Sequence, residues 1–454
     1  MDLDSLTALS PVDGRYAQAA DSLRQFMSEG ALIRERIRVE AAWLLALTTE
    51  VPQVLRAPLA PTVIDRARAM ATDPDTAAAL EVKAIERRIN HDVKAVEYYV
   101  RDQLEQAGAG PAVLELVHFG GTSEDINNLA YAKMLYRART AMLDRLEQLI
   151  TTLRALAHNY ADVAMLARTH GQTASPTTLG KEFANVVARL ERAHRRWRSV
   201  ELLGKWNGAV GNYNAQVAAF PEVDWRGVSR RLVESLGLGW NEYTTQIEPH
   251  DCVAEYADAL AAANVVLIDL ARDIWGYVSL GYLRQRAIAG EVGSSTMPHK
   301  VNPINFENAE GNLGVANALL RHFADKLPVS RWQRDLTDST VLRNVGVALA
   351  HTQIAWASFA SGLSKIEADV ERIDADLAGA HEVLGEAIQT VLRAAGVPNG
   401  YETLKAFTRG RRIDAAMLDE FIASLPLPPT ERQRLAGMRP ADYVGLAAAL
   451  ARAI

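Results

Sequence analysis

Apolar residues recur with helical spacing over long stretches of this chain. One stripe consists of Leu146, Leu149, Ile150, Leu153, Leu156 and Ala157, and similar stripes run through residues 180–203, 252–288, 311–326 and 342–366. Alanine, leucine and arginine dominate these windows, so propensity as well as period favours helix over strand. Helices of about 25 residues or more exceed the usual globular length and are typical of bundles. The sequence therefore predicts an all-α fold with a long central helix bundle.

The window from Tyr256 to Leu283 is apolar on more than one face. A helix that is buried all round needs more neighbours than one chain of this size conveniently supplies. We therefore expect a homo-oligomer with a shared helical core. A monomer is the alternative interpretation.

Breaks in the helical pattern indicate the domain boundaries. The run Gly108-Ala109-Gly110-Pro111 interrupts the first of the helical regions, and from about Ser364 the periodic segments become shorter and more charged. Glycine and proline are the strongest local breaks in a helical pattern. The sequence thus predicts three helical domains, at residues 1–110, 111–363 and 364–454.

Shorter patterns give more local expectations. A helix is expected over Leu32 to Leu47, and a second one through Ala78 to Leu104, with Asn90-His91-Asp92 inside it. No stretch of alternating β-branched residues competes with the helices, although Val210 to Ala219 can hold a short hairpin.

Composition excludes several classes of function. The chain has 454 residues, of which 49% are hydrophobic and 23% charged, as in ordinary soluble globular proteins. Its formal net charge of -6 argues against a general nucleic-acid or acidic-membrane partner, which requires a broad basic face. Cys252 is the only cysteine, so an intrachain disulfide and a thiolate metal cluster are excluded.

The N-terminus lacks the basic and apolar regions of a signal peptide. The longest apolar run, Ala259 to Ile268, is far shorter than the roughly 20 residues that a membrane span requires. We therefore expect a cytoplasmic protein without a membrane partner.

The most polar loop-like stretch runs from Gly290 to Gly311 and reads GEVGSSTMPHKVNPINFENAEG. Its potential ligand-binding side chains are Ser294, Ser295, His299, Lys300, Asn302 and Asn308. The glycines allow close backbone approach, and the prolines prevent a helix from running through. This stretch is either a reaction centre or a polar surface turn.

Three further polar clusters are candidates for chemistry. They are Thr122 to Asn128, Arg168 to Thr173, and Ser330 to Arg343, which contains three arginines. Each also has a structural interpretation, respectively a helix cap with Ser123 or Asp125, a hydrogen-bonding histidine and a solvated charged face. Phosphate loops, dinucleotide fingerprints, metal-ligand spacings and nucleophile elbows do not occur in the sequence. Acid/base chemistry without a cofactor or metal is what we expect.

The segment G-S-S-T-M-P-H-K-V-N-P at 293–303 resembles the signature of the fumarase/aspartase superfamily. Segments that resemble the bacterial type of the adenylosuccinate lyase family are R-Y at 15–16, N-H-D at 90–92, T-S-E-D-I-N-N at 122–128, R-T-H-G-Q at 168–172, Q-I-E-P-H-D at 246–251 and S-R-W-Q-R-D-L-T-D-S-T-V-L-R at 330–343. The resemblance implies three helical domains, a tetramer formed by the central bundle, and active sites each built from three subunits.

The resemblance also implies an activity, the cofactor-free β-elimination of fumarate from adenylosuccinate and from the succinyl-aminoimidazole-carboxamide ribotide, which yields AMP and AICAR. By resemblance Ser294 is the general base and His170 the general acid. Lys300 is expected to stabilise the alkoxide and the aci-carboxylate, and His91 either contacts the phosphate or assists His170. The implied substrate-binding residues are Thr122, Ser123, Ser295, Lys300 and Asn302 for the succinyl carboxylates; Arg15, Tyr16, Arg334, Ser339 and Arg343 for phosphate and ribose; Asn90 and Asp92 to orient His91; and Gln246, Asn308, Val301 and Thr340 elsewhere around the substrate.

Two rival interpretations stay open at this point. Another superfamily activity, such as that of argininosuccinate lyase or aspartase, is the first. His299 and the cluster of Arg331, Arg334 and Arg343 favour a phosphorylated substrate instead. A non-catalytic helical scaffold is the second, and the presence of both proton-transfer candidates speaks against it.

Overall fold

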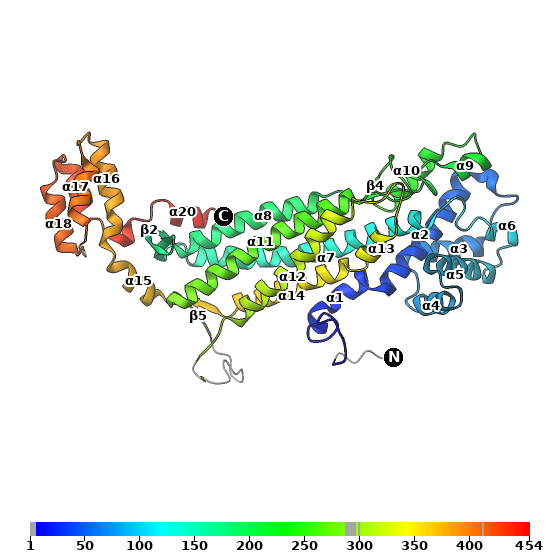
Figure 1. The fold of residues 1–454 in the computed structure, drawn as a ribbon, viewed down its shortest axis with the longest axis horizontal. Helices are drawn as coiled ribbons and strands as arrows, with labels where there is room; N and C mark the ends of the chain where they lie inside the picture. Colours follow the sequence, from blue (N-terminus) through cyan, green and yellow to red (C-terminus); the bar gives the residue numbers. More distant parts are fainter. Residues whose placement is uncertain (1–5, 287–296, 298–299, 411–412) are drawn as a thin grey trace. The chain divides into compact units, whose positions relative to one another are not determined.

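The computed structural model describes residues 6–286, 297, 300–410 and 413–454. Ser294, Ser295 and His299 lie outside these described residues. In the first part of the chain the elements are α1 (Ala17–Met27), α2 (Glu29–Glu50), the 3-10 helix η1 (Pro52–Val54), α3 (Pro61–Thr72), α4 (Ala78–Ile89), α5 (Asp92–Gln106) and α6 (Pro111–Leu114) (Figure 1).

The longest helices follow. The central elements are α7 (Ser123–Asn159), β1 (Ala164–Thr169), β2 (Gln172–Thr178), α8 (Leu179–Ser199), β3 (Leu203–Gly204), α9 (Asn214–Ala219), α10 (Trp225–Ser235), β4 (Gly239–Trp240), α11 (Asp251–Leu280), β5 (Leu283–Gln285), α12 (Ile304–Lys326), α13 (Thr337–Leu342) and α14 (Val345–Leu363). The predicted stripes fall on α7, α8, α11, α12 and α14, so the prediction of an all-α fold with long helices is confirmed.

The last part of the chain forms short helices. They are α15 (Val370–Ala378), η2 (His381–Leu384), α16 (Gly385–Ala394), α17 (Gly400–Thr408), α18 (Ala415–Ser424), α19 (Pro429–Ala436), η3 (Pro440–Asp442) and α20 (Ala447–Arg452), preceded by strand β6 (Ile366–Ala368). Leu384, Ile388, Leu392, Leu418 and Ile422 belong to the buried apolar cluster that holds this region together. None of the helices in the described part of the chain is both long and apolar enough to cross a bilayer.

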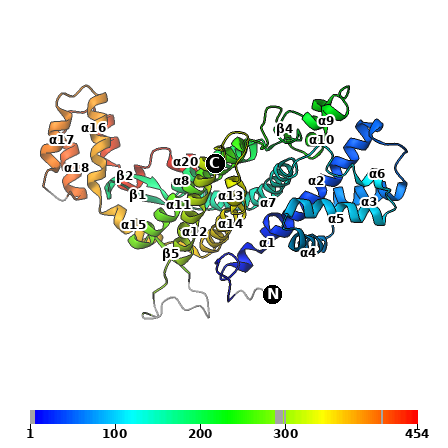
Figure 2. The same ribbon diagram turned by 45° about the vertical axis from the view of Figure 1, so that its right-hand side comes forward.

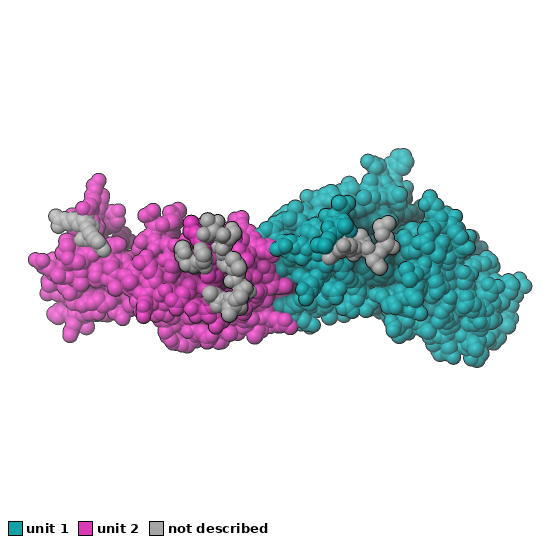
Figure 3. All heavy atoms as spheres, turned by 90° about the horizontal axis from the view of Figure 1, so that it is seen from below, with its two compact units in different colours: residues 1–145, 193–265, 311–355 teal, residues 146–192, 266–310, 356–454 magenta. Residues whose placement is uncertain are grey.

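The chain divides into two compact units. Unit 1, teal in Figure 3, comprises Met1–Arg145, Ala193–Val265 and Gly311–Ala355, and unit 2, magenta, comprises Leu146–Arg192, Val266–Glu310 and Trp356–Ile454. The three domains expected from the sequence stay a prediction.

In unit 1, helix α2 provides much of the core. It packs against α1, α3 and α5, and it buries Ile37, Leu44 and Leu47 completely. Trp43 of the same helix stacks on Trp206 with ring centroids 4.5 Å apart. Such a stacked pair adds to the stabilisation that comes from burial alone. The N-terminal part of α7 lies in this unit too, and the residues around its start therefore have a well-packed support.

In unit 2, an antiparallel hairpin carries one of the candidate residues. Strands β1 and β2 pair from Ala164↔Thr178 to Thr169↔Gln172, and β1 packs against α15 (Figure 2). His170 and Gly171 form the two-residue turn, with φ values of 52° and 73°. Positive φ at both positions is the geometry of a type I′ turn, which matches the twist of a hairpin.

Three local predictions were wrong. The helix expected from Ala78 to Leu104 is two helices, α4 and α5, because Asn90 adopts a left-handed conformation with φ 55° and His91 caps α5. Val210 to Ala219 does not form a hairpin, since Tyr213 has φ 57° and leads directly into α9. The helical stripe predicted over 252–288 is longer than the observed helix, which ends at Leu280. Gly281 then adopts φ 76° and the chain enters β5.

Candidate active site

A pocket in unit 1 collects residues that come from four separate parts of the sequence. Its lining consists of Arg36, His91, Asp92, Val93, Ser123, Glu124, Asn127, Tyr131, Arg334, Leu336, Ser339, Thr340, Leu342 and Arg343. Seven of these, His91, Asp92, Ser123, Arg334, Ser339, Thr340 and Arg343, are residues that the sequence singled out. The structure thus brings the segments at 90–92, 122–128 and 330–343 together within one unit.

The break between α4 and α5 presents the first segment to the pocket. Asn90 ends α4 in a left-handed conformation, which asparagine tolerates better than most residues. His91 is the N-cap of α5, and its Nδ1 accepts a hydrogen bond from the Lys94 N–H at 3.1 Å. With Nδ1 engaged as an acceptor, the remaining ring nitrogen, Nε2, carries any proton that the neutral imidazole donates. His91 is 55% exposed and therefore accessible to a ligand.

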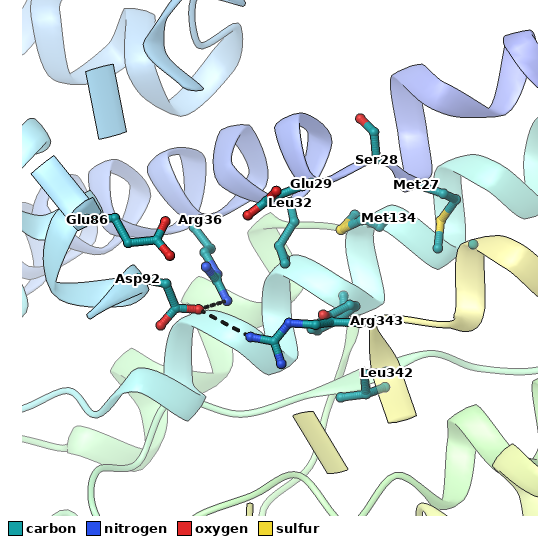
Figure 4. A pocket seen from close by; sticks show the side chains of 12 residues that line it. Met27, Ser28, Glu29, Leu32, Arg36, Glu86, Asp92, Met134, Leu342 and Arg343 are labelled. Carbon is teal, nitrogen blue, oxygen red and sulfur yellow. Dashed lines mark ion pairs between the residues drawn. The ribbon is translucent and has the colours of Figure 1, made fainter. Parts of the chain in front are cut away.

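Asp92 lies between two guanidinium groups. Its Oδ2 is 2.9 Å from Nη2 of Arg36 and 3.8 Å from Nη2 of Arg343, as Figure 4 shows for a neighbouring cavity that shares these three residues. Partial burial by itself raises the pKa of Asp92, but Arg36, the Val93 N–H and Arg343 together lower this pKa below its ordinary value. The carboxylate is therefore ionised at neutral pH and fixes the direction in which the two arginines point.

Arg334 is held by three polar side chains. Its guanidinium contacts Oε1 of Glu124 at 3.0 Å, Oε1 of Gln246 at 3.1 Å and the Ser339 hydroxyl at 3.3 Å. Its Nε is buried and has no hydrogen-bond partner among the residues that the structure describes. A buried donor without a partner is costly, and a ligand acceptor would relieve that cost.

The start of α7 is fixed by a fully buried ion pair. Asp125 and Lys205 lie 2.9 Å apart, with both side chains 0% exposed. The Asp125 carboxylate also accepts hydrogen bonds from the N–H groups of Thr122, Asn207 and Gly208, at 2.8, 2.9 and 3.1 Å. These bonds hold the Thr122-Ser123 backbone at the N-terminus of a long helix, a position that favours anionic ligands.

The pocket has the chemistry of an anion site with polar surroundings. Its lining carries three guanidinium groups against two carboxylates, together with hydroxyls and the imidazole of His91. Guanidinium groups bind phosphate and carboxylate oxygens through paired hydrogen bonds. The hydroxyls of Ser123, Ser339 and Thr340 suit a ligand that also carries sugar hydroxyls.

Other predicted residues lie elsewhere. Arg15 is exposed and Tyr16 precedes α1, both in unit 1 and outside the pocket lining. Thr122 precedes the pocket residue Ser123, and Gln246 accepts a hydrogen bond from the pocket residue Arg334. In unit 2, His170 is exposed at the hairpin turn, Lys300 and Val301 are exposed, and Asn302 and Asn308 are partly buried. Ser294 and Ser295, predicted as the base and a carboxylate ligand, lie outside the described residues.

Arg36 and Tyr131 are among the pocket residues that sequence reasoning missed. Both are buried, at 5% and 9% exposure, although their side chains line the cavity. A signal for Arg36 existed, because it stands between Ile33 and Ile37 on the apolar side of α2. A charged residue on a buried helix face requires a partner, and that requirement could have marked it.

Comparisons with known proteins place the chain among lyases. A family model described as Lyase matches residues 14–318, and one described as Adenylosuccinate lyase C-terminal matches residues 330–444. The chain is 51% identical over 453 residues to an adenylosuccinate lyase of Escherichia coli, covering 98% of each chain. It is also 51% identical over 455 residues to one of Vibrio cholerae, with 98% coverage of both, and 49% identical over 457 residues to one of Haemophilus influenzae, with 99% coverage of both.

Two solved structures share the fold. A fumarate lyase from Mesorhizobium sp. BNC1 aligns with a TM-score of 0.75 at 20% identity, over 95% of this chain and 96% of the other. The 3-carboxy-cis,cis-muconate lactonizing enzyme from Pseudomonas putida aligns with a TM-score of 0.74 at 22% identity, over 95% of both chains. At these identities the likeness concerns the fold alone.

Proposed function

This chain belongs to the adenylosuccinate lyase family, and on that premise we propose that it cleaves adenylosuccinate to fumarate and AMP. We extend the proposal to the succinyl-aminoimidazole-carboxamide ribotide, which the same reaction converts to fumarate and AICAR. Both substrates carry a phosphate, a ribose and a succinyl group with two carboxylates. A site for them must therefore bind a strongly anionic molecule and manage two proton transfers.

The observation that carries this proposal is the convergence of Arg36, Arg334 and Arg343 on one pocket in a chain of net charge -6. Arg343 is 58% exposed and therefore accessible to a ligand, and Arg334 has a buried Nε that lacks a partner among the described residues. We assign the phosphate and ribose to these two arginines together with Ser339, Arg15 and Tyr16. Thr122 and Ser123, at the start of α7, take a succinyl carboxylate.

The chemical step removes a proton from the carbon beside a carboxylate and breaks the bond between the neighbouring carbon and nitrogen. The carbanion formed first is stabilised as a doubly charged aci-carboxylate, and the departing nitrogen must gain a proton. We propose Ser294 as the base and His170 as the acid. A serine hydroxyl is too weakly acidic to act alone, so Lys300 is proposed to stabilise its alkoxide and the aci-carboxylate.

The remaining roles are proposed on the same basis. Asn90 and Asp92 orient His91, which contacts the phosphate or assists His170. Ser295 and Asn302 bind carboxylates, and Gln246, Asn308, Val301 and Thr340 surround the base and the succinyl group. We further propose a cytoplasmic homotetramer with shared sites. This assembly is proposed from the sequence resemblance and from the apolar character of the 256–283 window.

Fumarate release by the purified protein is the direct test. We expect fumarate to form from adenylosuccinate and from the succinyl-aminoimidazole-carboxamide ribotide without any added cofactor. The change in ultraviolet absorbance as the substrate is consumed measures the reaction. Argininosuccinate and aspartate are the matched negative substrates, because each contains the succinyl carbon–nitrogen bond that would break but no nucleotide phosphate. Release of fumarate from either of these, with none from adenylosuccinate, would contradict the proposal.

A further inference from the structure

Arg36 is a buried cation outside the segments that resemble those of the family. It lies on α2 between apolar residues such as Ile33 and Ile37, and it is only 5% exposed. Removing a guanidinium from water is expensive unless its hydrogen-bonding groups find fixed partners. The partners of Arg36 therefore indicate why the chain tolerates this charge here.

Those partners lie on two different helices. Nη2 of Arg36 contacts the Asp92 carboxylate at 2.9 Å, at the start of α5. Nε of Arg36 donates a hydrogen bond to Oδ1 of Asn127 at 2.9 Å, in the first turns of α7. A planar guanidinium holds two such partners at a fixed angle, whereas a lysine ammonium is a point charge on a flexible stem.

The second branch continues to Arg334, whose Nε has no partner in the described part of the chain. Asn127 Nδ2 donates to Oε1 of Glu124 at 2.8 Å, and the same oxygen accepts from Arg334 at 3.0 Å. Glu124 and Asn127 are 2% and 8% exposed, so water screens these bonds little. One guanidinium thus controls Asp92 directly and Arg334 through two buried side chains.

We propose that Arg36 is a positioning residue for the lyase reaction, which sets the orientation of Asp92 and Arg334 toward the nucleotide. The inference rests on the proposed function, because it assigns Arg36 to the binding of that substrate. Both ends of the network line the pocket, whereas a purely structural link between α2 and α7 would not need to end in pocket-lining groups.

Steady-state kinetics of Arg36→Met with adenylosuccinate test the proposal. We expect KM to rise about tenfold or more while kcat changes by less than about threefold, since misplaced binding groups weaken ground and transition state alike. Arg36→Lys keeps the buried positive charge but cannot hold both partners at the fixed angle of a guanidinium. Its KM should therefore lie between those of the wild type and Arg36→Met. Asn127→Ala removes only the branch toward Arg334. The double variant, Arg36→Met with Asn127→Ala, should raise KM by less than the product of the two single-variant fold changes.

Arg38→Met is the matched control. Arg38 lies two residues further along α2, where it donates to the Thr72 carbonyl and pairs with Glu35, and neither partner lines the pocket. We expect its KM to equal that of the wild type. An unchanged KM in both Arg36→Lys and Asn127→Ala, or a loss confined to kcat that parallels a fall in Tm, would overturn the positioning role. Absence of fumarate release by the wild type would instead overturn the proposed function, and the inference with it.

Discussion

Individual side chains in the pocket are controlled by opposite charges in close contact. Asp92 meets Arg36 and Arg343, Glu124 meets Arg334, and the fully buried Asp125 meets Lys205. The first two sets of contacts fix Arg334 and Arg343, which are proposed to bind the nucleotide, and the third holds the start of α7. Removing one member of a buried pair leaves the other charge without compensation, which is strongly destabilising. Arg343 is the exception, because it is largely exposed and its loss should leave the fold intact.

The sequence predicted these residues unevenly. The resemblance of the segments at 90–92, 122–128 and 330–343 to those of a known family led to Asp92, Ser123, Arg334 and Ser339. Arg36 was not predicted, although its position between Ile33 and Ile37 indicated a charge on a buried helix face. Its partners are distant in sequence, and only the fold reveals that the same guanidinium reaches both α5 and α7.

At the residue scale we predict that Ser294→Ala and His170→Asn each lose about 10²-fold or more in turnover. Each would remove one of the two proposed proton-transfer groups, while the pocket that holds the nucleotide keeps its residues. KM or AMP binding should therefore change little. Turnover and thermal unfolding of both variants provide the measurement, and near-normal turnover in Ser294→Ala would remove that serine from the role of base.

Single elements determine which groups face the pocket. The left-handed Asn90 converts an otherwise continuous apolar period into α4 and α5, and so places His91 at a helix start. Periodicity could not predict this break, because the apolar spacing keeps its phase across it. The β1–β2 hairpin was likewise missed, since neither strand alternates buried and exposed residues. The long helices were predicted because their period persists for many turns.

A partly buried pair of ionisable side chains links the loop between α6 and α7 to helix α2. His118 Nδ1 lies 2.6 Å from Oε1 of Glu40, whose side chain is 0% exposed. Burial by itself lowers the pKa of His118, but the hydrogen bond and the charge of Glu40 raise this pKa above its ordinary value. A histidine whose pKa is higher in the folded than in the unfolded state stabilises the fold when it is protonated. This stabilisation is fully present below the unfolded-state pKa of about 6.5 and is lost as pH rises through the folded-state pKa.

We therefore predict that the free energy of unfolding of the wild type exceeds that of His118→Gln most strongly near pH 6. The difference should shrink steadily as pH rises from about 6.5 to 9, because the glutamine does not titrate. Urea unfolding at several pH values measures this difference, with His158→Gln at an exposed histidine as the control. A difference that is the same at every pH would show that the pair does not couple proton binding to folding.

At the scale of the whole molecule, the proposed site residues divide between the two compact units. Asp92, Ser123, Arg334 and Arg343 belong to unit 1, whereas His170, Lys300 and Asn302 belong to unit 2. The sequence resemblance expects sites that are shared among the subunits of a tetramer, and this assembly stays a prediction. The family itself follows from similarity over nearly the full length of the chain.

The central claim is that the unit 1 pocket holds the nucleotide, and AMP binding to Arg343→Met tests it most directly. Arg230→Met is the matched control, because Arg230 is 60% exposed and pairs with Glu234 on α10, away from the pocket. Isothermal titration calorimetry should show the Kd for AMP rising about tenfold or more in Arg343→Met, as expected when a charge-assisted contact is lost, and unchanged in the control. An equal Kd in wild type and Arg343→Met would contradict the account.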